Sequence, residues 1–435
     1  MAINAYRASI LHFHDDPDTV GEDASYTYFD DGMLVVEDGC VHELGGAATT
    51  LTGLPEGAIL HDHSGSLIVP GFIDTHIHYP QTEMIAAYGE KLLQWLETYT
   101  FPTESRFADA DYAAAISERF LDELLRCGTT TALVFGTVHP QSVDAFFEAC
   151  EQRNLRMIAG KVMMDRNAPD NLVDTLESGY ADSRALIEKW HGRSRLRYAV
   201  TPRFSATSTP EQLQSAGRLL QEYPDVYLHT HLAENRDEVA WVKELFPDCA
   251  GYLDTYDQAG LLGRRSVFAH CVHLEDEEWR RMAATESNIA FCPASNLFLG
   301  SGLFNLRRAI SEGVRVGLGT DVGAGTSFSM LKVMTDAYKT QKLADHRLSP
   351  FKAFYLATLG GARSLDLDDV IGNFAPGKEA DFVILDRAAT PLQAFRIEHC
   401  QNLLQELFVL ATLGDDRTIA ATYSAGNCVH RKQEN

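Results

Sequence analysis

Short apolar runs rich in β-branched residues alternate along the chain with longer stretches of mixed polarity. Between the runs, segments such as 112–127 and 211–223 place apolar residues at helical spacing, which predicts amphipathic helices. Near-continuous apolar strands that alternate with helices predict a parallel sheet covered by helices. Eight such repeats predict an α/β fold of the (β/α)8 TIM-barrel type. The predicted strands cover residues 71–78, 129–136, 155–164, 196–204, 226–234, 266–274, 288–296 and 315–323.

The two ends of the chain have a different pattern. Glycine-punctuated, strand-like runs lie at 32–44, 65–70, 377–386 and 418–430. We expect both ends to combine in one small β-sandwich, because two independent end domains would each have a thin core. The predicted domains are an N-terminal sandwich segment at 1–70, a catalytic barrel at 71–365 and a C-terminal sandwich segment at 366–435.

Candidate metal ligands stand at the carboxyl ends of four predicted strands, where the chemistry of a TIM barrel takes place. They are His76 and His78 on the first strand, His229 and His231 on the fifth, His270 on the sixth and Asp321 on the eighth. Residues two apart on a strand point to the same face, so each His-x-His pair aims both rings the same way. A lone histidine is more often a core residue, but four coinciding strand ends favour a metal site. Imidazoles with one carboxylate suit zinc first, with iron as the alternative.

Glu234 follows His231 by three residues and is expected just past the fifth strand. A carboxylate beside a metal can accept a proton from the activated water and return it to the leaving group. The alternative is a helix-capping or solvated acid, since the sequence NRDE follows. The predicted metal nearby favours the role in proton transfer.

Composition and charge point to a small-molecule enzyme. The formal net charge of 37 − 61 = −24 repels phosphate backbones, so no nucleic acid is expected as partner. No stretch approaches the roughly 20 apolar residues of a membrane span, and the N-terminus lacks a signal-peptide pattern. The eight cysteines are scattered without a Cys-x-x-Cys pair, which is typical of reduced cytosolic thiols. We therefore expect a cytoplasmic enzyme without a membrane partner.

In several segments the sequence resembles the amidohydrolase superfamily, and within it the guanine deaminase family. The matching segments are PGFIDTHIHYPQ (70–81), TPRFS (201–205), HLAENRDE (231–238), AHC (269–271), CPASNLFLGSGLFN (292–305) and GLGTDVGAGTSFSM (317–330). Residues 372–386 resemble the closing strand of the superfamily's β-sandwich. The resemblance implies hydrolysis of guanine to xanthine and ammonia, one Zn²⁺ per subunit and a homodimer.

The resemblance also implies a role for individual residues. The implied metal ligands are His76, His78, His231 and Asp321. The implied catalytic residues are Glu234 as proton shuttle, Asp321, and His270 holding the attacking water. The implied substrate contacts are Gln81, Arg203, Phe204, His231, Glu234 and Asp321. His229 and His273 are close rivals of His231 and His270, and only the resemblance chooses between them.

Two of these residues suit guanine chemically. Arg203 can donate to the carbonyl O6, and Gln81 can donate and accept where a ring N–H and a C=O lie side by side. Phe204 is expected to stack on the ring or to wall it. Sister deaminases acting on 8-oxoguanine, a pterin, cytosine or an aminotriazine share the metal ligands and are the rival enzymes. A catalytically dead scaffold barrel is the non-enzyme rival, disfavoured because the ligand set is complete.

Two further segments bear on the site. Binuclear amidohydrolases carry a carboxylated lysine at the end of strand four, where this chain has Thr201 to Phe204 instead. Lys161 lies on the third predicted strand and is interpreted as structural, so one metal is expected. The insertion 82–104 either forms a lid or pocket wall or packs against the barrel, and no site residue is assigned to it.

Overall fold

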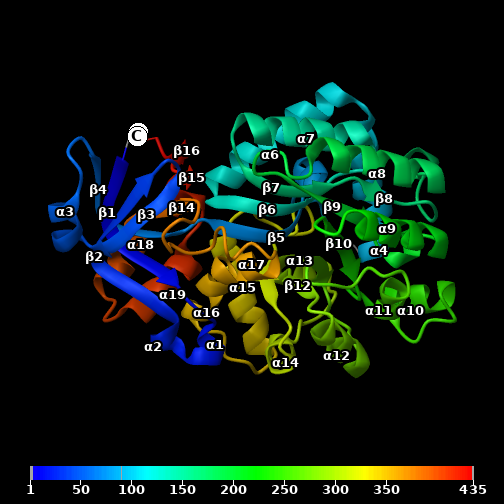
Figure 1. Cartoon of the computed structure of the whole chain (residues 1–435). Helices are drawn as coiled ribbons and strands as arrows, with labels where there is room; N and C mark the ends of the chain where they lie inside the picture. The colour runs from blue at the N-terminus through cyan, green and yellow to red at the C-terminus, as the bar shows by residue number, and fades with distance from the viewer. Residues whose placement is uncertain (1–2, 90, 434–435) are drawn as a thin grey trace.

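The computed structural model describes residues 3–89 and 91–433 and consists of a barrel beside a β-sheet built from both chain ends (Figure 1). The barrel strands are β5 (Phe72–His78), β6 (Thr129–Phe135), β7 (Arg156–Gly160), β9 (Arg197–Pro202), β10 (Tyr227–Leu232), β11 (Ser266–His270), β12 (Asn288–Phe291) and β13 (Val316–Leu318). They pair in parallel in this order, and the short β8 (Val162–Met163) pairs with β9. Every predicted strand is present, and the predicted fold is confirmed.

The barrel closes where β13 packs against β5. The Thr75 hydroxyl donates to the Leu318 carbonyl at 3.0 Å, and the Asp321 amide donates to the His76 carbonyl at 2.9 Å. A Cβ atom added at Gly317 would lie 2.3 Å from Thr75 Cγ2. Only glycine therefore lets β13 approach β5 this closely, and this approach brings Asp321 to the histidines of β5.

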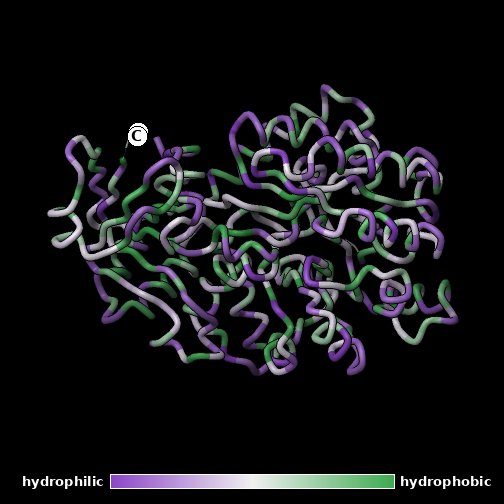
Figure 2. Tube along the Cα trace, in the orientation of Figure 1, coloured by the Kyte–Doolittle hydropathy of each residue, from purple (hydrophilic) through white to green (hydrophobic). Residues whose placement is uncertain are grey.

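Amphipathic helices surround the strands, and their polar faces point outward. The helices after β6 to β13 are α7 (Pro140–Gln152), α8 (Leu176–Trp190), α9 (Pro210–Glu222), α10 (Arg236–Leu245), α11 (Tyr252–Asp257), α12 (Asp276–Ala284), α13 (Pro293–Phe298), α14 (Leu306–Glu312), α15 (Met330–Leu343), α16 (Pro350–Leu356) and α17 (Leu359–Ser364). Figure 2 shows hydrophobic residues along the central strands and hydrophilic ones on the outer helices. The barrel core is thus formed by the strands and the inward helix faces.

The connection from β5 to β6 is the longest of the barrel. It comprises η1 (Tyr79–Met84), α4 (Leu92–Trp95), the π-helical η2 (Leu96–Thr100), α5 (Phe101–Glu104), η3 (Ser105–Ala108) and α6 (Ala110–Arg126). Asp109 caps α6 by accepting from the amides of Asp111 and Tyr112. The short 3-10 turns η4 (Asp170–Leu172) and η5 (Ser205–Thr207) follow β8 and β9.

The terminal segments form one seven-stranded sheet. Its strands are β1 (Ile3–Phe13), β2 (Tyr26–Glu37), β3 (Cys40–Gly46), β4 (Ile59–Pro70), β14 (Phe382–Asp386), β15 (Ile419–Ser424) and β16 (Asn427–Arg431), in the order β16-β15-β14-β4-β1-β2-β3. The two chain ends meet where β4 pairs antiparallel with β14, with Pro70 opposite Phe382. The predicted union of both termini in one β-unit is confirmed, but its strands lie in a single sheet and not in the two facing sheets of a sandwich. The sequence pattern did not single out the inner strand β1.

Short helices complete this unit and join it to the barrel. They are α1 (Pro17–Val20), α2 (Glu22–Ser25), α3 (Ala47–Gly53), α18 (Pro391–Glu398), α19 (Leu403–Leu413) and η6 (Asp416–Thr418). The guanidinium of Arg195, just before β9, donates to Glu379 and Asp381 beside β14, each at 2.6 Å. The pair with Asp381 is buried and the pair with Glu379 is partly buried, and together they connect the sheet to the barrel.

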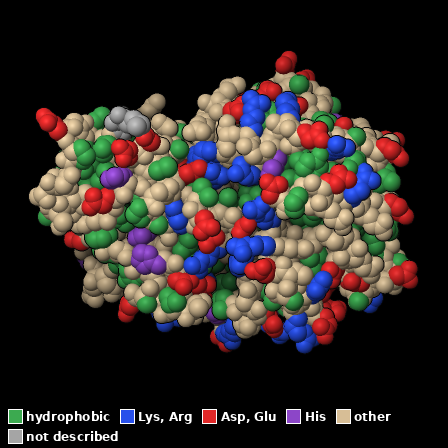
Figure 3. Space-filling model, in the orientation of Figure 1, with side chains coloured by type: hydrophobic (Ala, Val, Ile, Leu, Met, Phe, Trp, Pro, Cys, Tyr) green, Lys and Arg blue, Asp and Glu red, His purple; other side chains and the backbone are tan. Residues whose placement is uncertain are grey.

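The surface is polar and mixed in charge. Acidic and basic side chains are interspersed over the face seen in Figure 3. Within residues 3–89 and 91–433, the helices are too short or too polar to cross a membrane.

Candidate active site

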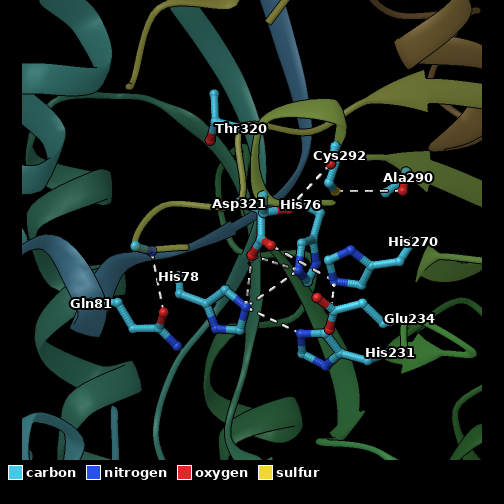
Figure 4. A network of polar contacts seen from close by, with 12 residues as sticks. His76, His78, Gln81, His231, Glu234, His270, Ala290, Cys292, Thr320 and Asp321 are labelled. Atoms are coloured by element: carbon cyan, nitrogen blue, oxygen red, sulfur yellow. Dashed lines mark hydrogen bonds and ion pairs between the residues drawn. The ribbon is translucent and has the colours of Figure 1, made fainter. Parts of the chain in front are cut away.

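Three histidines and one aspartate converge at the carboxyl ends of the barrel strands (Figure 4). His76 and His78 at the end of β5 turn their Nε2 atoms toward each other at 3.3 Å. His231 on β10 brings its Nε2 to 3.2 Å from Nε2 of His78. Oδ1 of Asp321, three residues past β13, lies 3.2 Å from Nε2 of His76 and 3.3 Å from Nε2 of His78. The structure therefore brings together the four residues predicted as ligands.

The His231 ring has a defined tautomer. Its Nδ1 lies 2.7 Å from the carbonyl oxygen of Arg203, which can only accept, so Nδ1 carries the proton. Its Nε2 then presents a lone pair to the cluster. Burial, together with the charges of neighbouring histidines, holds the pKa of His231 well below its usual value. Burial also lowers the pKa of His78 to about 3. Both rings are therefore neutral at physiological pH, the state in which imidazole binds a metal.

The rival histidines lie elsewhere. His229, also on β10, is buried one layer deeper, with its Nε2 2.7 Å from Nδ1 of His76. His273 is half-buried, and its Nε2 lies 2.8 Å from the carbonyl oxygen of Ser301. His270, at the end of β11, points into the cluster, and its donor nitrogen lies within 4.8 Å of those of His76 and His231. These distances place His231 and His270 at the cluster, and His229 and His273 outside it. Residue spacing alone does not make this choice.

Asp321 is an acid held in its charged form. Burial opposes ionisation, but the neighbouring His76 and His78 outweigh it and hold the pKa of Asp321 well below its usual range. Its backbone has φ 51°, a left-handed conformation that is uncommon outside glycine. His270 shares this feature with φ 72°. Unusual backbone at two neighbouring side chains is typical of functional sites.

Glu234 lies just past β10, beside the cluster. Its Oε2 is 3.6 Å from Nε2 of His270, whose Nδ1 lies 2.9 Å from Oδ1 of Asn296. The Ser301 hydroxyl donates to Oε1 of Glu234 at 3.2 Å. Burial, with the charge of Asp321, raises the pKa of Glu234 to about 8. A carboxyl group with this pKa can both take up and release a proton near neutral pH.

Glu234 does not cap the following helix. Asn235 and Glu238 form the capping box of α10, with the Asn235 side chain accepting from the Asp237 amide. One oxygen of Glu238 accepts from the amides of Glu234 and Asn235, each at 2.9 Å. Glu234 is therefore not the helix cap that the sequence offered as an alternative, because Asn235 and Glu238 already accept from the free amides at the start of α10.

A pocket opens over the cluster and is walled by the residues predicted to recognise the purine. Gln81 on η1 and Arg203 and Phe204 after β9 line it, together with apolar side chains from the insertion, Leu92, Trp95 and Leu96. The insertion 82–104 is thus a pocket wall, one of its two predicted roles. Gln81 and Arg203 are each 2% exposed, so both polar groups are desolvated. Arg203 is therefore not the surface ion pair that an acidic protein would favour.

Glu104, on α5, was missed by the sequence analysis. It is 1% exposed and accepts hydrogen bonds from both Arg203 and Gln81. Residue spacing offers no signal for this contact, because Glu104 and Arg203 are 99 positions apart. Lys161 is buried and donates to both carboxylate oxygens of Asp174 at 2.7 Å, away from the cluster.

A sequence model of the Amidohydrolase family matches residues 67–429, which is most of the chain. The chain belongs to this family. It is 58% identical over 418 residues to the guanine deaminase of Escherichia coli (strain K12), covering 96% of this chain and 95% of that protein.

Two solved structures extend the comparison. The structure of E. coli guanine deaminase superimposes with a TM-score of 0.97 at 57% identity, covering 99% of this chain and 100% of that one. A guanine deaminase from C. acetobutylicum, solved with guanine bound in its active site, has a TM-score of 0.89 at 30% identity, covering 98% and 100%. The resemblance to the amidohydrolases is therefore confirmed, and with it the assignment to hydrolases.

Proposed function

We propose that this amidohydrolase is a guanine deaminase, which hydrolyses guanine to xanthine and ammonia. The observation that carries the proposal is one pocket that Arg203, Gln81 and Glu234 line together with residues of the His–Asp cluster. In such a pocket, the groups proposed to recognise a purine and the groups proposed to hydrolyse it contact the two ends of one small ligand. The similarity to guanine deaminases over nearly the full chain supports the same reaction.

The cluster fits one divalent metal ion, and we propose Zn²⁺ held by His76, His78, His231 and Asp321. Three Nε2 atoms and a carboxylate oxygen lie 3.2–3.3 Å from their neighbours, a spacing that suits the ligand atoms of one tetrahedral zinc ion. The donor set of neutral imidazoles and an ionised carboxylate is one that zinc prefers and iron accepts. A metal bound there supplies Lewis acidity, which lowers the pKa of water to about 7.

The protein's own residues move the protons. Glu234 takes a proton from the attacking water and delivers it to a ring nitrogen of guanine, which makes C2 electrophilic. Asp321 and His270 orient the water from two other sides. Asn296 orients His270 through its Nδ1. Attack of the water oxygen on C2 gives a tetrahedral carbon that carries both the new hydroxyl and the amine. Glu234, ionised again, takes the hydroxyl proton and passes it to the amine, so the C2 carbonyl forms as the C–N bond breaks and ammonia leaves.

Arg203 and Gln81 supply specificity. The guanidinium donates to O6 of guanine, a position where adenine carries an amine that cannot accept in its place. Gln81 donates and accepts at the adjoining ring N–H and carbonyl edge. Phe204 walls the ring, with its own ring held edge-on by Trp241 at 6.1 Å between centroids. A substrate lacking O6 leaves the buried Arg203 donors unpaired, which is costly.

The direct test is ammonia release from guanine, compared at equal concentration with adenine, cytosine, 8-oxoguanine and isoxanthopterin. Rapid turnover of guanine alone supports the proposal. Preferred turnover of a competitor would leave the barrel and cluster in place and refute the recognition roles of Arg203 and Gln81. If protein with confirmed bound metal turned over none of these compounds, its substrate would lie outside this group of purines, pyrimidines and pterins.

We further propose a cytoplasmic homodimer with domains at 1–70, 71–365 and 366–435. All eight cysteines are unpaired thiols, which supports a reducing compartment. The first domain boundary falls between β4 and β5, and the second falls just after α17. Light scattering during size-exclusion chromatography tests the dimer, and a mass equal to one chain would contradict it.

A further inference from the structure

Glu104 closes α5 behind the substrate pocket. Its Oε2 accepts from Nη1 of Arg203 at 2.7 Å, and its Oε1 accepts from Nη2 of Arg203 at 3.1 Å. The same Oε1 accepts from Nε2 of Gln81 at 3.1 Å. Gln81 and Arg203 line the pocket, whereas Glu104 does not reach it. One buried carboxylate thus contacts both of the polar residues proposed to recognise the purine.

We propose that Glu104 is a positioning residue that orients Arg203 and Gln81 and neutralises the guanidinium, so that the pocket selects a neutral purine. The inference rests on the proposed function and adds to it a determinant of specificity. It also assigns a role to the insertion 82–104 beyond that of a wall.

Glu104 helps to fix the orientation of the Gln81 amide. A carboxylate only accepts and a backbone amide only donates, so Nε2 must face Glu104 and Oε1 must face the Gly323 amide, 3.2 Å away. These two contacts exclude the flipped amide. One Nε2 proton and one Oε1 lone pair remain for the ligand, in an order set by Glu104.

Glu104 also balances the charge of Arg203. Each of its two Nη atoms donates one hydrogen bond to Glu104. The Nε–H group and the remaining Nη–H groups are left to donate to the ligand. The Phe101 ring, also on α5, lies 5.7 Å from the guanidinium carbon and restricts it further. A buried guanidinium needs a counter-charge. Glu104 supplies that charge within the protein, so the ligand need not be an anion.

The test compares Glu104→Gln with the wild type for guanine and for urate, a purine that is an anion at neutral pH. Loss of the counter-charge should raise KM for guanine at least about tenfold with kcat little changed, because Glu104 hydrogen-bonds to Arg203 and Gln81 and not to the His–Asp cluster. The same loss should tighten inhibition by urate several-fold. A purely structural role would weaken both ligands together, and that result would overturn the inference.

Two further variants make the test independent of folding. Glu104→Asp keeps the charge but is one carbon shorter, so KM for guanine should rise while urate inhibition stays at the wild-type level. Glu83→Gln is the matched control, because Glu83 lies in the same insertion and pairs with Arg106 at the surface. Equal effects of Glu104→Gln and Glu83→Gln would also overturn the inference.

The failure of this inference can be distinguished from failure of the proposed function. A wild-type enzyme that does not turn over guanine refutes the function, whatever the variants do. In that case calorimetric binding of urate to wild type and Glu104→Gln still measures the neutralising role. Wild-type turnover with unchanged urate affinity in Glu104→Gln would refute the role of Glu104 alone.

Discussion

The backbone carbonyl of Arg203 accepts a hydrogen bond from Nδ1 of His231 at 2.7 Å. The residue proposed to read the purine therefore also sets, through its main chain, the tautomer of a proposed metal ligand. The side chain of Arg203 takes no part in this contact. A substitution of Arg203 should therefore affect substrate recognition through the side chain and leave the support of His231 by the backbone carbonyl intact.

Arg203→Lys should raise KM for guanine about tenfold or more and leave metal content unchanged. Lysine keeps a positive charge near Glu104 but loses the planar fork that can bond Glu104 and O6 together. Metal is retained because the backbone carbonyl at position 203 remains. Steady-state kinetics with elemental analysis checks this, and Arg106→Lys, at a surface ion pair, serves as control. Unchanged kinetics would remove Arg203 from recognition.

Metal removal should abolish activity and lower the thermal midpoint of unfolding. Dialysis against a chelator takes away the ion, and added Zn²⁺ should restore both properties, since a ligand of the native state stabilises it. His78→Ala should purify without metal because Nε2 of His78 lies within 3.3 Å of three other candidate ligand atoms. His273→Ala should keep its metal, because His273 contacts Ser301 instead. Metal loss in both variants would contradict the proposed ligand set.

Glu234→Gln should lower kcat about 10²–10⁴-fold with its metal still bound. Glutamine keeps the size of the side chain and its contact with Ser301 but cannot carry a proton between water and guanine. Glu244→Gln, on the exposed side of α10, is the control and should match the wild type. Activity retained by Glu234→Gln would exclude Glu234 from the mechanism.

Glu379 should contribute to stability in a pH-dependent manner. Burial acts to raise its pKa, but the hydrogen bond from Arg156 and the charge of Arg195 outweigh burial and hold the pKa of Glu379 below its ordinary value. Such a carboxyl stabilises the fold fully above its unfolded pKa of about 4.3 and loses this contribution as the pH falls through its folded pKa. Glu379→Gln should lower the free energy of unfolding by about 2–4 kcal/mol at neutral pH.

Urea unfolding of wild type and Glu379→Gln at pH 7, 5 and 4 measures this difference. It should begin to shrink below about pH 4.3, where the carboxyl of the unfolded chain takes up a proton, and should vanish only below the lower pKa of Glu379 in the folded protein. Comparing the two proteins at each pH cancels other effects of acid. Glu188→Gln, at an exposed ion pair with Arg184, is the control and should leave the stability close to that of the wild type at each pH. A difference that grows toward acid pH would refute the assignment.

The sequence by itself determined the barrel and the positions of its candidate ligands. Apolar periodicity is a local property, so eight strand runs could be predicted without knowledge of their neighbours. The two-residue repeat of a strand aims His76 and His78 to one face, and both point into the cluster. Four ligand-type strand ends then converge because parallel strands of a barrel end at the same rim.

Only the tertiary structure decided which of two equivalent histidines reaches the cluster. His229 and His231 share a face of β10, and their difference is depth in the barrel, which decides whether each ring meets His76 or His78 of β5. The contact of Glu104 with Arg203 was equally hidden, because it joins an insertion to a strand end 99 residues away. A local sequence pattern determines to which face of a strand or helix a side chain points. How deep that side chain lies in the barrel, and which distant residue it contacts, depend on the packing of elements far apart in the sequence.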